Sequence, residues 1–157
     1  MPEHYGIQKY WIACMLPQKR SVIPGWRDRM IVLDTSYLID FFKNEDLKSL
    51  IPDNEKPAVT IISYYEIMAG IQRLKSPKEE KFFRHFFSDI EVLEFNLPAA
   101  DIASGIAARM AATGNRVNAF DILITGIALF HHAGAIITAD TDFIEIAKYA
   151  DIDVIRY

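Results

Sequence analysis

The sequence predicts a single α/β domain built on a parallel sheet. Short apolar runs, as expected for buried strands, alternate along the chain with longer segments of helical periodicity. No internal repeat or low-complexity tract interrupts this alternation. With 157 residues and 51% hydrophobic content, the chain is long and apolar enough for one sheet covered by helices on both sides.

The clearest strand is the apolar run 30–33, which ends abruptly at Asp34. A strand that is apolar on both faces belongs inside a parallel sheet. Ligands of such sheets bind beyond the carboxyl ends of the strands, so Asp34 lies where chemistry is expected. The other strands are predicted at 58–60, 90–95, 135–138 and 152–155, with helices at 36–42, 45–50, 63–74, 77–87, 98–112, 119–132 and 141–149.

Residues 1–29 differ from the rest of the chain. They contain five basic and only two acidic residues, both tryptophans (Trp11 and Trp26), and prolines that break up regular structure. We therefore expect an N-terminal extension at 1–29 and the folded domain at 30–157. The sequence leaves open whether the extension packs on the domain or forms a basic, aromatic arm.

Composition also indicates the compartment. The single cysteine, Cys14, excludes an intramolecular disulfide and favours a reducing environment. The apolar stretch 11–16 is too short to span a bilayer or to act as a secretory signal, so we expect a cytoplasmic protein without membrane contact. Because residues 30–157 hold 12 basic and 19 acidic side chains, a polyanion would need a local basic patch or metal ions.

Four carboxylates are predicted at the same end of the sheet. Asp34 and Asp140 follow two strands that we expect to be neighbours, while Glu66 and Asp121 lie near the starts of two helices. Like charges that share a site raise one another's pKa unless a cation intervenes. Since hard divalent cations prefer oxygen ligands, the cluster predicts a Mg²⁺ or Mn²⁺ site.

Each of these acids also has a purely structural interpretation. Asp34 and Asp140 both precede helices, where aspartate is a favoured N-cap. Ser63 and Glu66 have the spacing of a capping box, and an acid at Asp121 suits the positive end of its helix. Only the convergence of all four carboxylates in space would favour the metal site over this structural interpretation.

Four segments, at 31–40, 63–70, 118–124 and 136–143, resemble in this order the acidic motifs of PIN domains, most closely those of VapC-type toxins. The resemblance implies a three-layer fold with a five-stranded parallel sheet in the order 3-2-1-4-5. It also implies metal-dependent hydrolysis of RNA. By this likeness the catalytic acids and metal ligands are Asp34, Glu66, Asp121 and Asp140, the supporting hydroxyls are Thr35, Ser36 and Thr138, and Asp142 is an auxiliary acid.

Basic residues around two loops are predicted to bind RNA phosphates, although an ordinary solvated surface is the alternative. They are Arg73, Lys75, Lys78, Lys81, Arg84, Arg109 and Arg116. Four phenylalanines at helical spacing in 82–87 indicate core packing, or else a groove for an antitoxin helix or a second copy of the chain. The expected partners are RNA, a cognate antitoxin and a second copy in a homodimer.

The leading functional hypothesis is an endoribonuclease that uses Mg²⁺ or Mn²⁺ and acts as the toxin of a VapBC-type pair. A PIN nuclease of housekeeping RNA processing is one alternative, and a receiver-like domain that binds phosphate and metal is another. The receiver-like alternative lacks the lysine it needs near Asp140 or after Ile155. No phosphate-binding loop and no Ser-His-Asp or Cys-His arrangement supports other chemistry.

Overall fold

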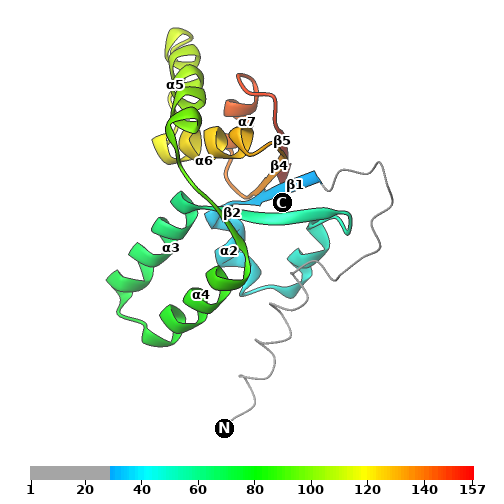
Figure 1. Ribbon diagram of the computed structural model, residues 1–157, viewed down its shortest axis with the longest axis vertical. Helices are drawn as coiled ribbons and strands as arrows, with labels where there is room; N and C mark the ends of the chain where they lie inside the picture. The colour runs from blue at the N-terminus through cyan, green and yellow to red at the C-terminus, as the bar shows by residue number, and fades with distance from the viewer. Residues whose placement is uncertain (1–28) are drawn as a thin grey trace.

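The computed structural model describes residues 29–157, so the predicted extension lies outside the described residues except for Arg29. Figure 1 shows helices on both sides of a twisted sheet. Among the helices of residues 29–157, none is both long enough and apolar enough to cross a membrane.

The sheet has five parallel strands in the order β3-β2-β1-β4-β5, as the resemblance implied. Its central strand β1 hydrogen-bonds to β2 on one side and to β4 on the other. Leu33 at the end of β1 pairs with Ile137 in β4, so the carboxyl ends of these two strands adjoin. The strands are β1 (Arg29–Leu33), β2 (Glu55–Thr60), β3 (Glu91–Leu93), β4 (Ala133–Thr138) and β5 (Asp153–Arg156).

Two apolar cores lie on opposite faces of the sheet. Ile31 and Leu33 of β1 belong to the first core, and Val32 between them belongs to the second. This double burial is what the uninterrupted apolar run predicts. The first core is formed with α2 (Thr35–Phe41), α3 (Ile61–Leu74) and α4 (Pro77–Asp89), and the second with α5 (Leu97–Ala112), α6 (Ala119–Phe130) and α7 (Asp142–Ala147); a 3₁₀ helix, η1, spans Glu45–Leu50.

Strand β2 is longer than predicted and contains Pro57. It begins at Glu55, whereas its pairing with β3 starts only at Ala58. Pro57 therefore lies where β2 has a neighbour on one side alone, so its missing N–H costs little. The predicted strand start at residue 58 is wrong because a strand can contain proline where it is paired on one side only.

Helix α3 begins two residues earlier than predicted, directly after β2. Its N-cap is Thr60, whose hydroxyl accepts a hydrogen bond from the Ser63 amide at 3.1 Å. Ser63 is therefore not the N-cap, and the predicted capping box with Glu66 does not form. The strand continues into the helix without a loop, so the buried threonine at its end takes the capping position. Glu66 consequently lies in the second turn, where capping no longer explains it.

Candidate metal centre

Asp34 is fixed at the point where β1 gives way to α2. The residue is buried, with 4% of its surface exposed, and its Oδ2 accepts hydrogen bonds from the Ser36 amide at 3.3 Å and the Ser36 hydroxyl at 2.8 Å. The Thr138 hydroxyl donates to the same oxygen at 2.9 Å. Since all three donors bind Oδ2, the other carboxylate oxygen makes no hydrogen bond to the described residues.

The hydroxyls of Ser36 and Thr138 connect the two central strands at their carboxyl ends. Their oxygens are 3.2 Å apart, and Ser36 Oγ accepts a hydrogen bond from the Ala139 amide at 3.0 Å. Thr138 Oγ1 accepts another from the Asp140 amide at 2.9 Å. These hydrogen bonds hold the loop after β4 against the start of α2, and they fix the backbone of Asp140.

Glu66 reaches the same region from α3. Its Oε2 accepts a hydrogen bond from the Thr35 hydroxyl at 2.7 Å, which ties α3 to the first turn of α2. Burial raises the pKa of Glu66, and the nearby Asp34 carboxylate raises it further, whereas the Thr35 hydrogen bond lowers it. Thr35 therefore both orients Glu66 and favours its ionised form.

Asp121 occupies the first turn of α6 and is the most perturbed acid of the site. It is buried, with 5% of its surface exposed, and its Oδ2 has no hydrogen-bond partner among the residues of the described domain. Burial, the largest cause, and four neighbouring carboxylates together raise the pKa of Asp121 to about 7. In order of influence, they belong to Asp34, Asp140, Asp142 and Glu66.

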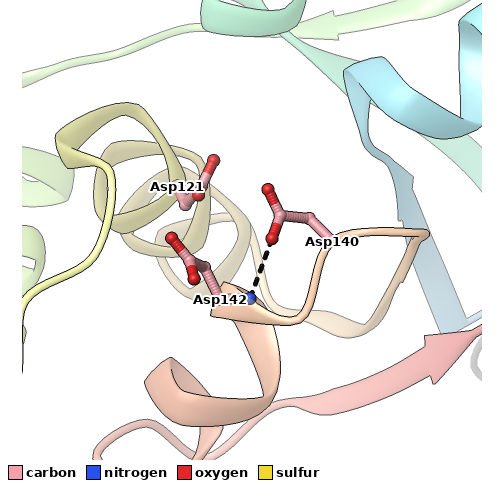
Figure 2. Close-up of side chains that lie close together, drawn as sticks. All are labelled: Asp121, Asp140 and Asp142. Atoms are coloured by element: carbon pink, nitrogen blue, oxygen red, sulfur yellow. Dashed lines mark hydrogen bonds between the residues drawn. The ribbon is translucent and has the colours of Figure 1, made fainter.

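Figure 2 shows the carboxylates of Asp121, Asp140 and Asp142 pointing toward one another from α6, from the loop after β4 and from the start of α7. One oxygen of each lies within 4.8 Å of the others. Asp140 Oδ1 accepts a hydrogen bond from the Asp142 amide at 2.9 Å, and Asp142 Oδ2 accepts one from the Asn118 amide at 3.3 Å. Backbone amides thus hold two of the three carboxylates in place.

The donor set fits a hard divalent cation. All of the converging ligand atoms are carboxylate oxygens, which Mg²⁺ and Mn²⁺ prefer over softer donors. The unpartnered Oδ2 of buried Asp121 is the specific sign of a missing partner, because a buried carboxylate oxygen without a hydrogen bond is costly. A cation between the acids would supply that partner and offset their repulsion.

The predicted RNA-binding residues lie in two parts of the chain, and Arg116 is two residues from Asn118, whose amide donates to Asp142. Glu66 lies in the middle of α3, whereas most of them follow from the end of α3 into α4, which Figure 1 shows projecting from the sheet. Arg84 pairs with Glu80 at 2.7 Å, and Arg109 donates to the Tyr149 carbonyl at 2.8 Å. All seven residues of the set are exposed, namely Arg73, Lys75, Lys78, Lys81, Arg84, Arg109 and Arg116.

Sequence reasoning overlooked a pair of aromatic side chains beside the acids. Tyr65 of α3 and Phe120 of α6 form an edge contact with ring centroids 5.8 Å apart. Each ring comes directly before one of the predicted acids, Glu66 or Asp121. An aromatic residue directly before each of two predicted acids was the signal in the sequence that could have identified this pair. In contrast, Phe83, Phe86 and Phe87 of α4 are buried, as core packing predicts.

The chain belongs to the PIN domain family, because residues 31–149 match the family model for the PIN domain. The match contains all four predicted acids and the three hydroxyl residues that surround them. It agrees with the resemblance seen in the sequence and with the strand order of the sheet. A search of curated proteins finds no significant match.

Several solved structures of VapBC assemblies contain a chain of similar fold. A chain in the structure of VapBC2 from Rickettsia felis, bound to a DNA fragment from its promoter, is similar with a TM-score of 0.68 and 18% identity. A chain of VapBC-5 from Mycobacterium tuberculosis gives a TM-score of 0.65 and 26% identity, and one of DNA-bound VapBC from Salmonella typhimurium gives 0.65 and 24%. In all three cases the alignment covers 82% of this chain and 98% of the other.

Proposed function

We propose that this protein is a metal-dependent endoribonuclease that hydrolyses RNA phosphodiester bonds. The observation that carries the proposal is Asp121, a buried acid with a near-neutral pKa, four carboxylate neighbours and an unpartnered oxygen. Such a concentration of negative charge opposes folding unless a cation relieves it. Membership of the PIN family supports a role for this cation in the hydrolysis of nucleic acid.

The contacts of the side chains support a division of roles within this proposal. Asp34, Glu66, Asp121 and Asp140 would hold the Mg²⁺ or Mn²⁺, with Asp142 as an auxiliary acid. When bound, the cation would neutralise charge on the scissile phosphodiester and make a bound water more acidic. The protein's own contribution is orientation: Ser36 and Thr138 hold Asp34, and Thr35 holds Glu66.

Asp34→Asn tests the catalytic assignment. Asparagine caps helices as well as aspartate does, so the variant loses the charge while keeping the start of α2. We expect a folded protein with no cleavage of a fluorescent RNA oligonucleotide in Mn²⁺, whereas Asp101→Asn, on the exposed surface of α5, should cut at the wild-type rate. A folded Asp34→Asn variant that cuts normally would remove Asp34 from the mechanism.

Metal dependence has a readout independent of cleavage. Wild-type protein melted with and without Mn²⁺ should be stabilised by roughly 2.7 kcal/mol when the metal is present at 100 times its dissociation constant. Mg²⁺ should act in the same direction. Unchanged melting in both metals, together with intact RNA, would refute the metal site and the nuclease together.

We further propose that the exposed basic residues bind RNA phosphates. Arg73 and Lys78 are suited to this role because they are exposed and make no ion pair with the described residues. Replacing both with serine should weaken RNA binding and reduce its salt dependence, while leaving Mn²⁺ binding unchanged. An unchanged salt dependence would indicate an ordinary solvated surface.

We also propose that the protein acts in the cytoplasm as the toxin of a VapBC-type pair, binds a cognate antitoxin and forms a homodimer. Support comes from the similar chains, which belong to VapBC structures. Expression of the chain alone should arrest growth, and Asp34→Asn should not. A housekeeping nuclease would cleave RNA without arresting growth. Light scattering on the purified chain tests the homodimer.

A further inference from the structure

Tyr65 is unusual in exposing a large aromatic ring next to the acids. With 56% of its surface accessible, it is one of two exposed aromatic residues in the region 29–157, and the other is Phe95 at 39%. Ile61, one turn earlier on the same face of α3, is also exposed at 37%. A single exposed aromatic residue is ordinary, so location must decide whether this one has a role.

The location is set by two helices that also carry the acids. Tyr65 immediately precedes Glu66 on α3, and Phe120 immediately precedes Asp121 on α6. The rings meet edge to face, with centroids 5.8 Å apart and planes at 77°. Phe120, which is only partly exposed, thereby contacts the Tyr65 ring, while more than half of the surface of Tyr65 stays accessible. The pair therefore links α3 and α6 at the turns that carry Glu66 and Asp121.

The chemistry of the cluster makes a neutral contact useful there. Five acids repel a polyanionic backbone, so in that region binding energy must come from a metal ion or from an uncharged part of the substrate. Nucleobases stack on aromatic side chains irrespective of sequence, because every base has a π face. The Tyr65 hydroxyl, which makes no hydrogen bond within the described domain, is also free to contact a base or ribose.

We propose that Tyr65, braced by Phe120, stacks a nucleobase of the RNA next to the scissile phosphate. This inference rests on the proposed ribonuclease function and assigns the aromatic pair a substrate-positioning role. The ring holds the nucleotide so that its phosphate faces the acids. Because stacking is sequence-tolerant, the contact positions the RNA without selecting one base.

The test uses Tyr65→Leu, which keeps apolar bulk without a π face, and Tyr65→Phe, which keeps the ring. Cleavage of a fluorescent single-stranded RNA in Mn²⁺ should show KM raised about 10-fold in the leucine variant, within the range of one stacked base, and changed less than about 2-fold in the phenylalanine variant. Phe95→Leu is the matched control and should leave KM unchanged. Melting temperatures establish that each variant is folded.

Oligonucleotides with a single abasic ribose separate stacking from packing. At one position near the cut, the missing base should raise the KM of the wild-type enzyme about as much as the leucine substitution does. The same missing base should raise the KM of the leucine variant little further. Equal abasic losses in both enzymes at every position, or a wild-type KM in the leucine variant, would overturn the inference while leaving the nuclease intact. A wild-type chain that cuts no RNA would overturn both.

Discussion

Replacing Asp121 with asparagine should stabilise the metal-free protein at pH 8. The carboxylate is buried, and its neighbours and its burial together raise its pKa from 3.8 to about 7. A change of this size corresponds to roughly 4 kcal/mol against folding once the group is ionised. Because the site opens to solvent at Asp140, screening reduces the cost, and we expect a gain of about 2 kcal/mol.

The pH dependence follows from the sign of this change. An acid whose pKa is raised in the folded state opposes folding fully above the folded value of about 7 and not at all below the unfolded value of 3.8. Wild-type stability should therefore fall, relative to the variant, as the pH rises through this window. At pH 5 the gain in free energy of unfolding from Asp121→Asn should be less than about half of the gain at pH 8.

Thermal unfolding in EDTA measures the effect. A gain of about 2 kcal/mol raises the melting temperature by about 4–8 °C for a chain of this size. Asp101→Asn, on the exposed surface of α5, is the control for loss of charge and should change the melting temperature little at either pH. Mn²⁺ should stabilise the wild type more than Asp121→Asn, because the variant has lost both a ligand and the repulsion that a cation relieves.

An Asp121→Asn variant that is no more stable than the wild type in EDTA at pH 8 would contradict this account of the site. The asparagine amide can donate hydrogen bonds to neighbouring carboxylates, so loss of hydrogen bonding cannot account for such a result. It would mean that repulsion from the carboxylates around Asp121 does not destabilise the folded state. A cation would then have no repulsion to relieve at this site.

Two further predictions concern support and packing. Thr35→Val removes the 2.7 Å hydrogen bond that lowers the pKa of Glu66. The rate of RNA cleavage should therefore fall about 10-fold, and the acid limb of the pH profile of cleavage should move to higher pH. Thr35→Ser is the control, and an unshifted acid limb would show that Thr35 does not act through Glu66. Gly126→Ala should lower the free energy of unfolding, measured by urea denaturation, by about 1–3 kcal/mol, because the new methyl would lie 2.7 Å from Ala103 Cβ. Gly70→Ala, with nothing within 4 Å, should instead raise it by about 0.5–1 kcal/mol, and equal effects of the two substitutions would contradict the close packing of α5 and α6.

The sequence predicts the fold well because its signals are local and agree with one another. The apolar run of β1 and its termination at Asp34 identify a central strand, and alternation with helices identifies a parallel sheet. Boundaries were missed where a tertiary contact decides them. Pro57 is tolerated in β2 because β3 pairs only beyond it, and Thr60 caps α3 because the strand runs directly into the helix.

The sequence predicted that Asp34, Glu66, Asp121 and Asp140 converge, with Asp142 as an auxiliary acid, whereas the group whose carboxylate oxygens lie within 4.8 Å of one another is Asp121, Asp140 and Asp142. Adjacent ends of β1 and β4 bring Asp34 and Asp140 to one edge, which topology alone predicts. The near-neutral pKa of Asp121 depends on its burial and on the carboxylates of four residues from separate parts of the chain, which no spacing along the chain encodes. The contact between Tyr65 and Phe120 was missed for the same reason, since two helices distant in sequence create it.

The structural and functional interpretations of these acids prove to be compatible in the geometry of Asp34. Its Oδ2 caps α2 and receives every hydrogen bond of that side chain, so the capping role uses only one oxygen and leaves the other available to a cation. Glu66 and Asp121 differ, because Thr60 and Asn118 cap their helices instead. Where another residue already provides the cap, the buried Asp121 and the half-buried Glu66 need a different reason to be stable, and the proposed divalent cation would supply one.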